Sequence, residues 1–147
     1  MGTKKILPII AGVVVKGLGA ARHFVKGQLP GFARIFPEVK DCFPGTINVL
    51  AAQGLVLQDP DCRIPPFPEV SPFLNEFFDL WRARVRFGAS KVWRKAWIYR
   101  SSDSIHRLNP CYLELIADPM PDPPAEGMKC ELRVDKPVRP LGWLIIG

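Results

Sequence analysis

Short apolar or alternating runs, separated by turn residues, make up most of the chain. Runs rich in β-branched and aromatic residues lie at 13–15, 46–50, 92–99, 112–117, 128–134 and 143–146. Two proline clusters, at 65–68 and 119–124, exclude regular strand or helix there because proline removes backbone hydrogen-bond donors. This layout predicts an all-β fold, either a barrel or a sandwich.

Helical periodicity is limited to two short segments. Residues 30–36 and 70–80 have patterns that favour a short helix, and each is bordered by proline. With 147 residues and 48% hydrophobic content, the chain can bury a core of its own. We therefore expect one domain over residues 1–147, with few and short helices.

Residues 43–49, Phe-Pro-Gly-Thr-Ile-Asn-Val, combine a turn with a short β-type run. Side chains alternate along a strand, so Thr46 and Asn48 would face one side while the apolar neighbours face the other. A hydroxyl and an amide oxygen in this arrangement suit Mg²⁺, which prefers hard oxygen ligands. Both ligands are neutral, which favours an ion that arrives with nucleotide phosphates. The alternative is an ordinary tight turn entering a strand, where Thr and Asn satisfy local backbone groups.

Residues 12–25 contain a glycine-bearing loop. The valines at 13–15 favour a strand, Gly17 and Gly19 interrupt it, and Phe24 with Val25 predict a returning strand. Such loops let backbone N–H groups approach phosphate, and Arg22 would add a forked donor nearby. The alternative is a simple hairpin connection.

Three segments of the chain together resemble the archaeal-type CTP-dependent riboflavin kinases. The family's Gly-Leu-Gly-Glu-Gly-Arg-Tyr-Phe is similar to Gly-Leu-Gly-Ala-Ala-Arg-His-Phe at 17–24, and its Gly-Thr-Leu-Asn to Gly-Thr-Ile-Asn at 45–48. The family strand Ile-Ile-Glu-Ile-Ile-Ala is similar to Tyr-Leu-Glu-Leu-Ile-Ala at 112–117. The resemblance spans roughly residues 11 to 134.

The resemblance implies a fold and a set of site residues. The fold would be a six-stranded barrel of the cradle-loop type. Thr46 and Asn48 would hold Mg²⁺, and Glu114 would contact the flavin together with Ser104, for which His106 is the alternative. The nucleotide-binding residues would be Gly17, Leu18, Gly19, Ala20, Ala21 and Arg22.

The chain departs from the family pattern at two places. Ala21 replaces the third glycine of the loop, and its methyl group would hinder close approach to phosphate. The family's basic CTP-contacting segment is replaced by a proline-rich segment at 118–125 that carries Asp118 and Asp122. Because carboxylates repel phosphate, the nucleotide preference stays open.

Cysteine usage and hydropathy bear on metal sites and location. The cysteines at 42, 62, 111 and 130 have no CxxC spacing, and the chain has only two histidines, so zinc and iron–sulfur sites are not expected. The apolar run at 5–15 resembles a signal sequence, but it contains Pro8 and lacks a convincing cleavage site. No run approaches the roughly 20 apolar residues of a membrane span. We therefore expect a cytoplasmic protein without a membrane partner.

Basic and aromatic residues are concentrated between 81 and 107. This stretch contains eight Lys or Arg residues and one acidic residue, Asp103. The aromatic residues Trp81, Trp93, Trp97 and Tyr99 lie between the basic ones. The pattern favours a solvated basic strand face with tryptophans in the core. A phosphate-attracting wall is the second interpretation, and nucleic-acid binding is the third. We do not expect a nucleic-acid partner.

These observations give one functional hypothesis and one alternative. The hypothesis is phosphoryl transfer from a nucleoside triphosphate, CTP by resemblance, to riboflavin with Mg²⁺, giving FMN. The alternative is a non-catalytic flavin-, nucleotide- or nucleic-acid-binding barrel that has lost kinase activity.

Overall fold

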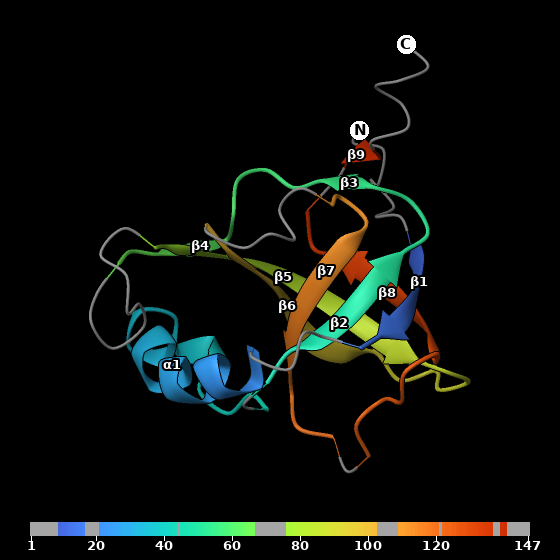
Figure 1. The fold of residues 1–147 in the computed structure, drawn as a ribbon, viewed down its shortest axis with the longest axis horizontal. Helices are drawn as coiled ribbons and strands as arrows, with labels where there is room; N and C mark the ends of the chain where they lie inside the picture. Colours follow the sequence, from blue (N-terminus) through green and yellow to red (C-terminus); the bar gives the residue numbers. More distant parts are fainter. Residues whose placement is uncertain are drawn as a thin grey trace, which may run out of the picture.

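The computed structural model describes residues 9–16, 21–43, 45–66, 76–102, 109–120, 122–136 and 139–140, with side chains in the first helix given from residue 28 onward. Within these ranges the chain forms a closed six-stranded antiparallel barrel with one α-helix against its outside (Figure 1). This confirms the prediction of an all-β barrel.

The barrel closes through one continuous ring of antiparallel pairs. Its strands, in spatial order, are β5 (Phe78–Phe87), β6 (Arg94–Ser101), β7 (Tyr112–Ala117), β2 (Ile47–Ala51), β1 (Ile10–Val15) and β8 (Lys129–Val134). The ring closes because β8 also pairs with the second half of β5, from Ala83 to Phe87. Full closure leaves these strands without free edges over the paired positions.

The barrel interior is filled by one side of every strand. In β2, Ile47 and Val49 point into this core, and in β7, Leu113 and Leu115 do the same. The residues between them therefore face outward, as strand alternation requires. Asn48 and Glu114 are two such outward residues.

Three short strands lie outside the ring. The strand β4 (Cys62–Ile64) pairs with the first half of β5, and β3 (Leu55–Val56) pairs with β9 (Arg139–Pro140) as a separate ribbon. This ribbon lies at the top of the barrel in Figure 1.

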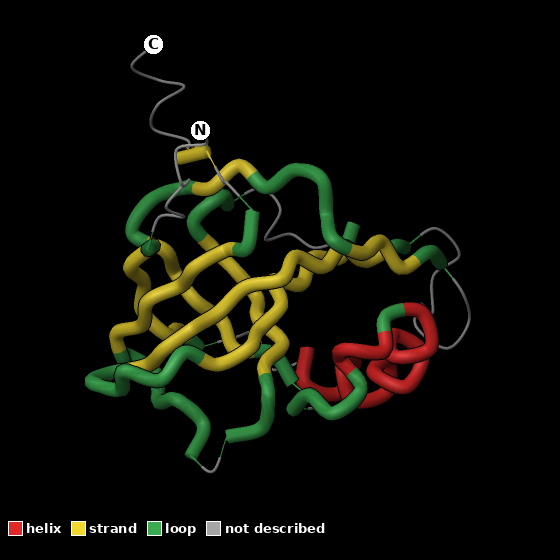
Figure 2. Tube along the Cα trace, turned by 180° about the vertical axis from the view of Figure 1, so that it is seen from behind, coloured by secondary structure: helices red, strands yellow, loops and turns green. Residues whose placement is uncertain are grey.

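A second apolar core lies between the outer barrel wall and the helix α1 (Ala21–Ile35). Leu29, Phe32 and Phe36 recur at helical spacing and are buried against β5, β6 and β7. Phe32 packs on Phe78 with ring centroids 5.2 Å apart. Figure 2 shows the helix, in red, beside the strands of the barrel. Tertiary packing of this stripe stabilises α1 more than its intrinsic propensity does.

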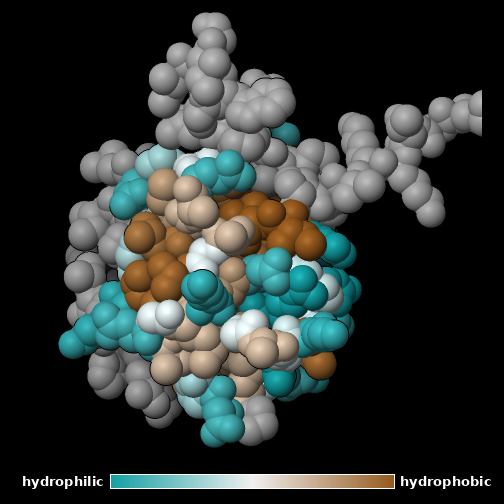
Figure 3. Space-filling model, turned by 90° about the vertical axis from the view of Figure 1, so that its right-hand side faces the viewer, coloured by the Kyte–Doolittle hydropathy of each residue, from teal (hydrophilic) through white to brown (hydrophobic). Residues whose placement is uncertain are grey.

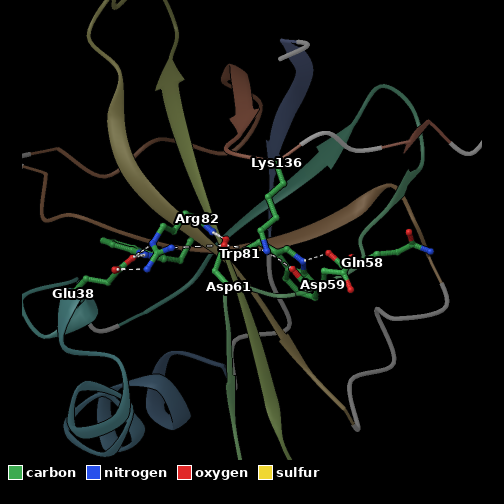
Figure 4. A network of polar contacts seen from close by, with 8 residues as sticks. Glu38, Gln58, Asp59, Asp61, Trp81, Arg82 and Lys136 are labelled. Carbon is green, nitrogen blue, oxygen red and sulfur yellow. Dashed lines mark hydrogen bonds and ion pairs between the residues drawn. The ribbon is translucent and has the colours of Figure 1, made fainter. Parts of the chain in front are cut away.

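A polar network fastens the segment after α1 to the barrel. The 3₁₀ helix η1 (Pro37–Val39) presents Glu38, which accepts hydrogen bonds from Arg82 Nε at 2.8 Å and from Trp97 Nε1 at 2.6 Å. Arg82 N–H also donates to Asp61, which pairs with Lys136 Nζ at 3.1 Å (Figure 4). The network joins residues from η1, the β3–β4 connection, β5, β6 and the segment after β8.

The structure corrects two local predictions. Phe24 and Val25 were expected to begin a strand, but they lie inside α1. The helix expected at 70–80 is wrong where it is described, because Phe78 to Leu80 begin β5, whereas residues 70–75 lie outside the described ranges. The helix expected at 30–36 is confirmed as the last part of α1, which ends at Ile35.

Candidate functional site

One row of side chains crosses the outer wall of the barrel through four strands. Asn48 of β2 is opposite Val15 of β1 on one side and Glu114 of β7 on the other, and Glu114 is opposite Tyr99 of β6. Side chains directly opposite each other have Cβ atoms about 5 Å apart. The strands therefore bring Asn48 and Glu114, predicted separately as metal and flavin residues, into one site.

Asn48 supplies an unsatisfied oxygen to this site. The residue is 8% exposed, and its Oδ1 atom is buried without a hydrogen-bond partner among the described residues. Burial of an unpaired polar atom is unfavourable, so native proteins have few of them, and they occur where a water, an ion or a ligand completes the group. A hard cation such as Mg²⁺ fits this oxygen.

Thr46 lies at the entrance to β2. It precedes the strand, which begins at Ile47, and it is half-buried. Strand alternation continued back from Asn48 would bring its hydroxyl to the same outer face. Both Thr46 and Asn48 are neutral, so a cation held here would need charge from a bound phosphate.

Glu114, in the middle of the row, has a carboxyl group with a raised pKa. Burial raises the pKa of its carboxyl group to about 7, and the charge of Arg100 opposes that rise. A carboxyl group with such a pKa exists in both protonation states near neutral pH. It can therefore donate or accept a hydrogen bond to a ligand hydroxyl.

Two further polar residues near Glu114 were not among the sequence candidates. Tyr99 is 7% exposed, and its hydroxyl donates a long hydrogen bond of 3.4 Å to Gln28 Oε1 on α1. Burial, followed by the charge of Glu114, raises the pKa of the Tyr99 phenol. Tyr99 was recognised as part of the aromatic stretch, whereas Gln28 had no sequence signal because its role depends on how α1 packs.

The glycine segment begins where β1 ends. Residues 17–20, and with them the predicted Gly17, Leu18, Gly19 and Ala20, lie outside the described ranges. Ala21 and Arg22 form the first turn of α1 instead of a loop followed by a strand. The segment thus connects a strand to a helix N-terminus, where unpaired backbone N–H groups and the helix dipole favour anions.

An apolar groove of about 710 Å³ lies beside the polar row. Its lining includes Ala11 and Val13 of β1, Leu50 of β2, and Lys129 and Glu131 of β8. Val13 and Leu50 are directly opposite each other, two residues before Val15 and two after Asn48 respectively. Figure 3 shows hydrophobic residues, in brown, gathered on this side of the molecule beside hydrophilic residues, in teal.

The remaining predicted site residues are placed as follows. Ser104 and His106 lie outside the described ranges. In the acidic segment, Asp118 is half-buried and lines a cleft of about 390 Å³ together with Lys95 and Arg82, while Asp122 is exposed. The lining of this cleft also includes Arg84 and three further carboxylates, those of Glu38, Asp41 and Asp135.

The described part of the chain contains no group of three or more His, Cys, Asp or Glu residues able to hold a metal ion. None of its helices is long and apolar enough to cross a membrane. The cysteines Cys42, Cys62, Cys111 and Cys130 are free thiols.

Comparison with known sequences leaves the family unassigned. No protein-family model matches the chain, and the search of curated proteins finds no match.

Proposed function

We propose that this protein transfers a phosphoryl group from a nucleoside triphosphate to the terminal ribityl hydroxyl of riboflavin, forming FMN. The observation that supports the proposal is the register of three strands. Val15, which leads into the glycine segment, Asn48 and Glu114 lie side by side, although they come from three separate segments of the chain. These are the same segments that resemble the riboflavin kinase motifs.

Each residue has a role that follows from its position. Asn48 Oδ1, with the Thr46 hydroxyl, would hold Mg²⁺ beside the nucleotide. Backbone N–H groups at the start of α1 would bind the donor phosphates. Glu114 would accept a hydrogen bond from the ribityl hydroxyl and so hold it in line with the transferred phosphorus. Mg²⁺, when bound, would supply charge neutralisation for the phosphates.

The chemistry does not require a strong general base. Phosphoryl transfer depends mainly on the positioning of the two substrates and on stabilisation of the phosphate charge. The apolar groove beside Asn48 offers a surface of small side chains for the flavin ring system. The hydroxylated chain of the flavin would then extend toward Glu114.

The first test is a flavin-binding titration. Isoalloxazine fluorescence should be quenched by the purified protein with a dissociation constant of about 1 μM or lower, which corresponds to about 8 kcal/mol. Leu50→Arg should weaken riboflavin binding by placing a charge in the groove. The matched variant Val92→Arg, at an exposed position in the β5–β6 connection, should bind as wild type does. Failure to bind riboflavin or FMN would contradict the proposal.

Replacement of the two carboxylates of the acidic segment, Asp118 and Asp122, tests which nucleotide is the phosphoryl donor. If CTP lies near this segment, Asp118→Asn with Asp122→Asn should lower its KM, because the repulsion of phosphate is about 1 kcal/mol or more at an effective dielectric near 20. KM values for CTP, ATP, GTP and UTP in both proteins identify the donor. Equal values in the two proteins would place the segment away from the nucleotide.

A non-catalytic flavin- or nucleotide-binding protein is the second candidate. The observation that favours it is the pair of carboxylates, Asp118 and Asp122, at the position of the family's basic segment. This candidate predicts flavin binding without FMN formation with any of the four nucleotides.

A further inference from the structure

A row of three cations crosses the barrel wall that lies opposite the candidate site. Arg84 of β5 is directly opposite Lys95 of β6 on one side and Arg133 of β8 on the other. We call these three residues the basic row. The wall containing β5 is separated from β2 by two strands in each direction around the barrel, so the basic row and Asn48 are on different faces.

No direct ion pair neutralises the basic row within the described part of the protein. Arg84 and Lys95 are exposed, and neither they nor Arg133 take part in any ion pair within 4.0 Å among the described residues. The neighbouring arginines of β5 differ, since Arg82 pairs with Glu38 and Arg86 with Glu131.

Arg133 is fixed in place by an aromatic contact. Its guanidinium lies 5.1 Å from the centre of the Trp93 ring, and that of Arg86 lies 4.4 Å from the same ring. Its Nε atom is buried without a hydrogen-bond partner among the described residues. The ring thus holds two guanidinium groups beside each other at the edge of the basic row.

Like charges directly opposite each other on neighbouring strands destabilise a sheet. A surface that keeps three of them together, and holds one by stacking, is arranged for an anionic partner rather than for stability. The exposed Lys91 adds a further cation in the β5–β6 connection. Arg84 and Lys95 also line a cleft whose carboxylates limit the positive surface on that side; these carboxylates are Glu38, Asp41, Asp118 and Asp135.

We propose that the basic row binds the phosphate backbone of a nucleic acid. The Trp93 ring is already in contact with two guanidinium groups, so the contacts are to phosphates and not to stacked bases. Binding is therefore independent of base sequence and strongly dependent on salt. This inference does not rest on the proposed kinase function. It revises the expectation, drawn from the sequence, that nucleic acid is not a partner, because only the strand register shows that Arg84 lies opposite both Lys95 and Arg133.

The test is fluorescence anisotropy with labelled 20-nucleotide single-stranded and duplex oligonucleotides of two unrelated sequences. Wild-type protein should bind them at micromolar concentrations in 50 mM salt. Affinity should fall steeply toward 200 mM salt and be the same for both sequences. Arg84→Gln with Lys95→Gln should weaken binding at least tenfold and reduce the slope of log affinity against log salt by roughly 0.9 for each phosphate that the variant no longer neutralises.

Two control variants separate charge at this row from charge in general. Arg84→Lys with Lys95→Arg keeps both charges and should retain binding. Lys40→Gln removes one charge from an exposed position after η1 and should bind as wild type does.

Three results would overturn the proposal. The first is absence of oligonucleotide binding by the wild type in 50 mM salt. The second is unchanged binding by the double glutamine variant. The third is displacement of the oligonucleotide by poly-glutamate as effectively as by unlabelled nucleic acid, which would indicate an acidic protein partner instead.

Discussion

Asn48 and Glu114 lie directly opposite each other on the antiparallel strands β2 and β7, on the outer face of the barrel. One carries a buried amide oxygen without a described partner, and the other carries a carboxyl group whose pKa burial raises to about 7. Neither feature adds to the stability of the folded protein, because burial of an unpaired polar atom or of a carboxylate is unfavourable. A buried polar atom without a described partner and a carboxyl group with a raised pKa are both typical of functional sites, which is why we propose the reaction at this pair.

Replacement of Asn48 separates a functional role from a structural one. Asn48→Ala should lower phosphoryl transfer by about 100-fold, the loss typical of a contact that stabilises transition-state charge. It should change the free energy of unfolding by less than about 1 kcal/mol, because the oxygen removed makes no described hydrogen bond. Turnover assays and urea denaturation measure the two effects.

Asn48→Asp is the matched variant. It keeps an oxygen ligand and adds charge, so the Mg²⁺ concentration required for activity should change. Parallel loss of folding and activity in Asn48→Ala would instead support the ordinary turn interpretation of residues 43–49.

The acidity of Glu114 predicts a pH dependence of stability without nucleotide or Mg²⁺. Its pKa in the folded protein, about 7, is above the ordinary value of 4.5, so the folded state favours the protonated carboxyl group. Its contribution is fully present below pH 4.5 and is lost as pH rises through about 7. Glu114→Gln, which resembles the protonated form, should therefore equal wild type near pH 4.5 and exceed it at pH 8 by up to about 3 kcal/mol.

Urea denaturation of the two proteins at both pH values checks this prediction. A constant difference in the free energy of unfolding across the range would show that Glu114 does not titrate in the folded protein as described.

We expect the hydrogen bond from Trp97 to Glu38 to contribute more to stability than the ion pair between Arg82 and Glu38. Trp97 is 3% exposed and donates its indole N–H to Glu38 Oε1, whereas Arg82 is much more exposed. Glu38→Ala leaves that buried donor unpaired and should cost about 2 kcal/mol. Glu38→Gln keeps the acceptor and loses only the ion pair, so it should cost about 1 kcal/mol or less. Thermal unfolding of both variants measures these two costs. Equal losses of stability in Glu38→Ala and Glu38→Gln would contradict the prediction.

Gly12 tests the close packing of β1 on β2. A Cβ atom at this position would lie 2.8 Å from Val49 Cγ1 and 3.1 Å from the Leu50 carbonyl oxygen. Gly12→Ala should therefore destabilise the barrel by about 1 to 3 kcal/mol. Val49→Ala removes the nearer atom, so the double variant should be less destabilised than the sum of the two single variants. Simple additivity in urea denaturation would contradict this contact.

The sequence predicted the parts of the fold that depend on local alternation. The strand at 112–117 has the predicted bounds, and Ile47 with Val49 face the core while Asn48 faces outward, as their alternation requires. Within the described part of 81–107, Trp81 and Trp97 are buried and Arg84 is exposed, as a basic strand face requires, whereas Trp93 is only half-buried.

Local patterns failed where long-range packing decided the outcome. Phe24 and Val25 favour a strand by propensity, yet they belong to a helix held by the burial of Leu29, Phe32 and Phe36. The register that places Glu114 beside Asn48 joins distant segments and leaves no signature in either one. The contact between Tyr99 and Gln28 was not predictable for the same reason.

Formation of FMN by the purified protein tests the central claim most directly. Riboflavin and Mg²⁺ would be incubated with CTP, ATP, GTP or UTP in turn, and the flavins separated by chromatography. The account predicts that FMN accumulates in proportion to the protein with at least one nucleotide, stops on addition of EDTA and falls by about 100-fold in folded Asn48→Ala. Absence of FMN with all four nucleotides, in protein that is folded, would contradict it.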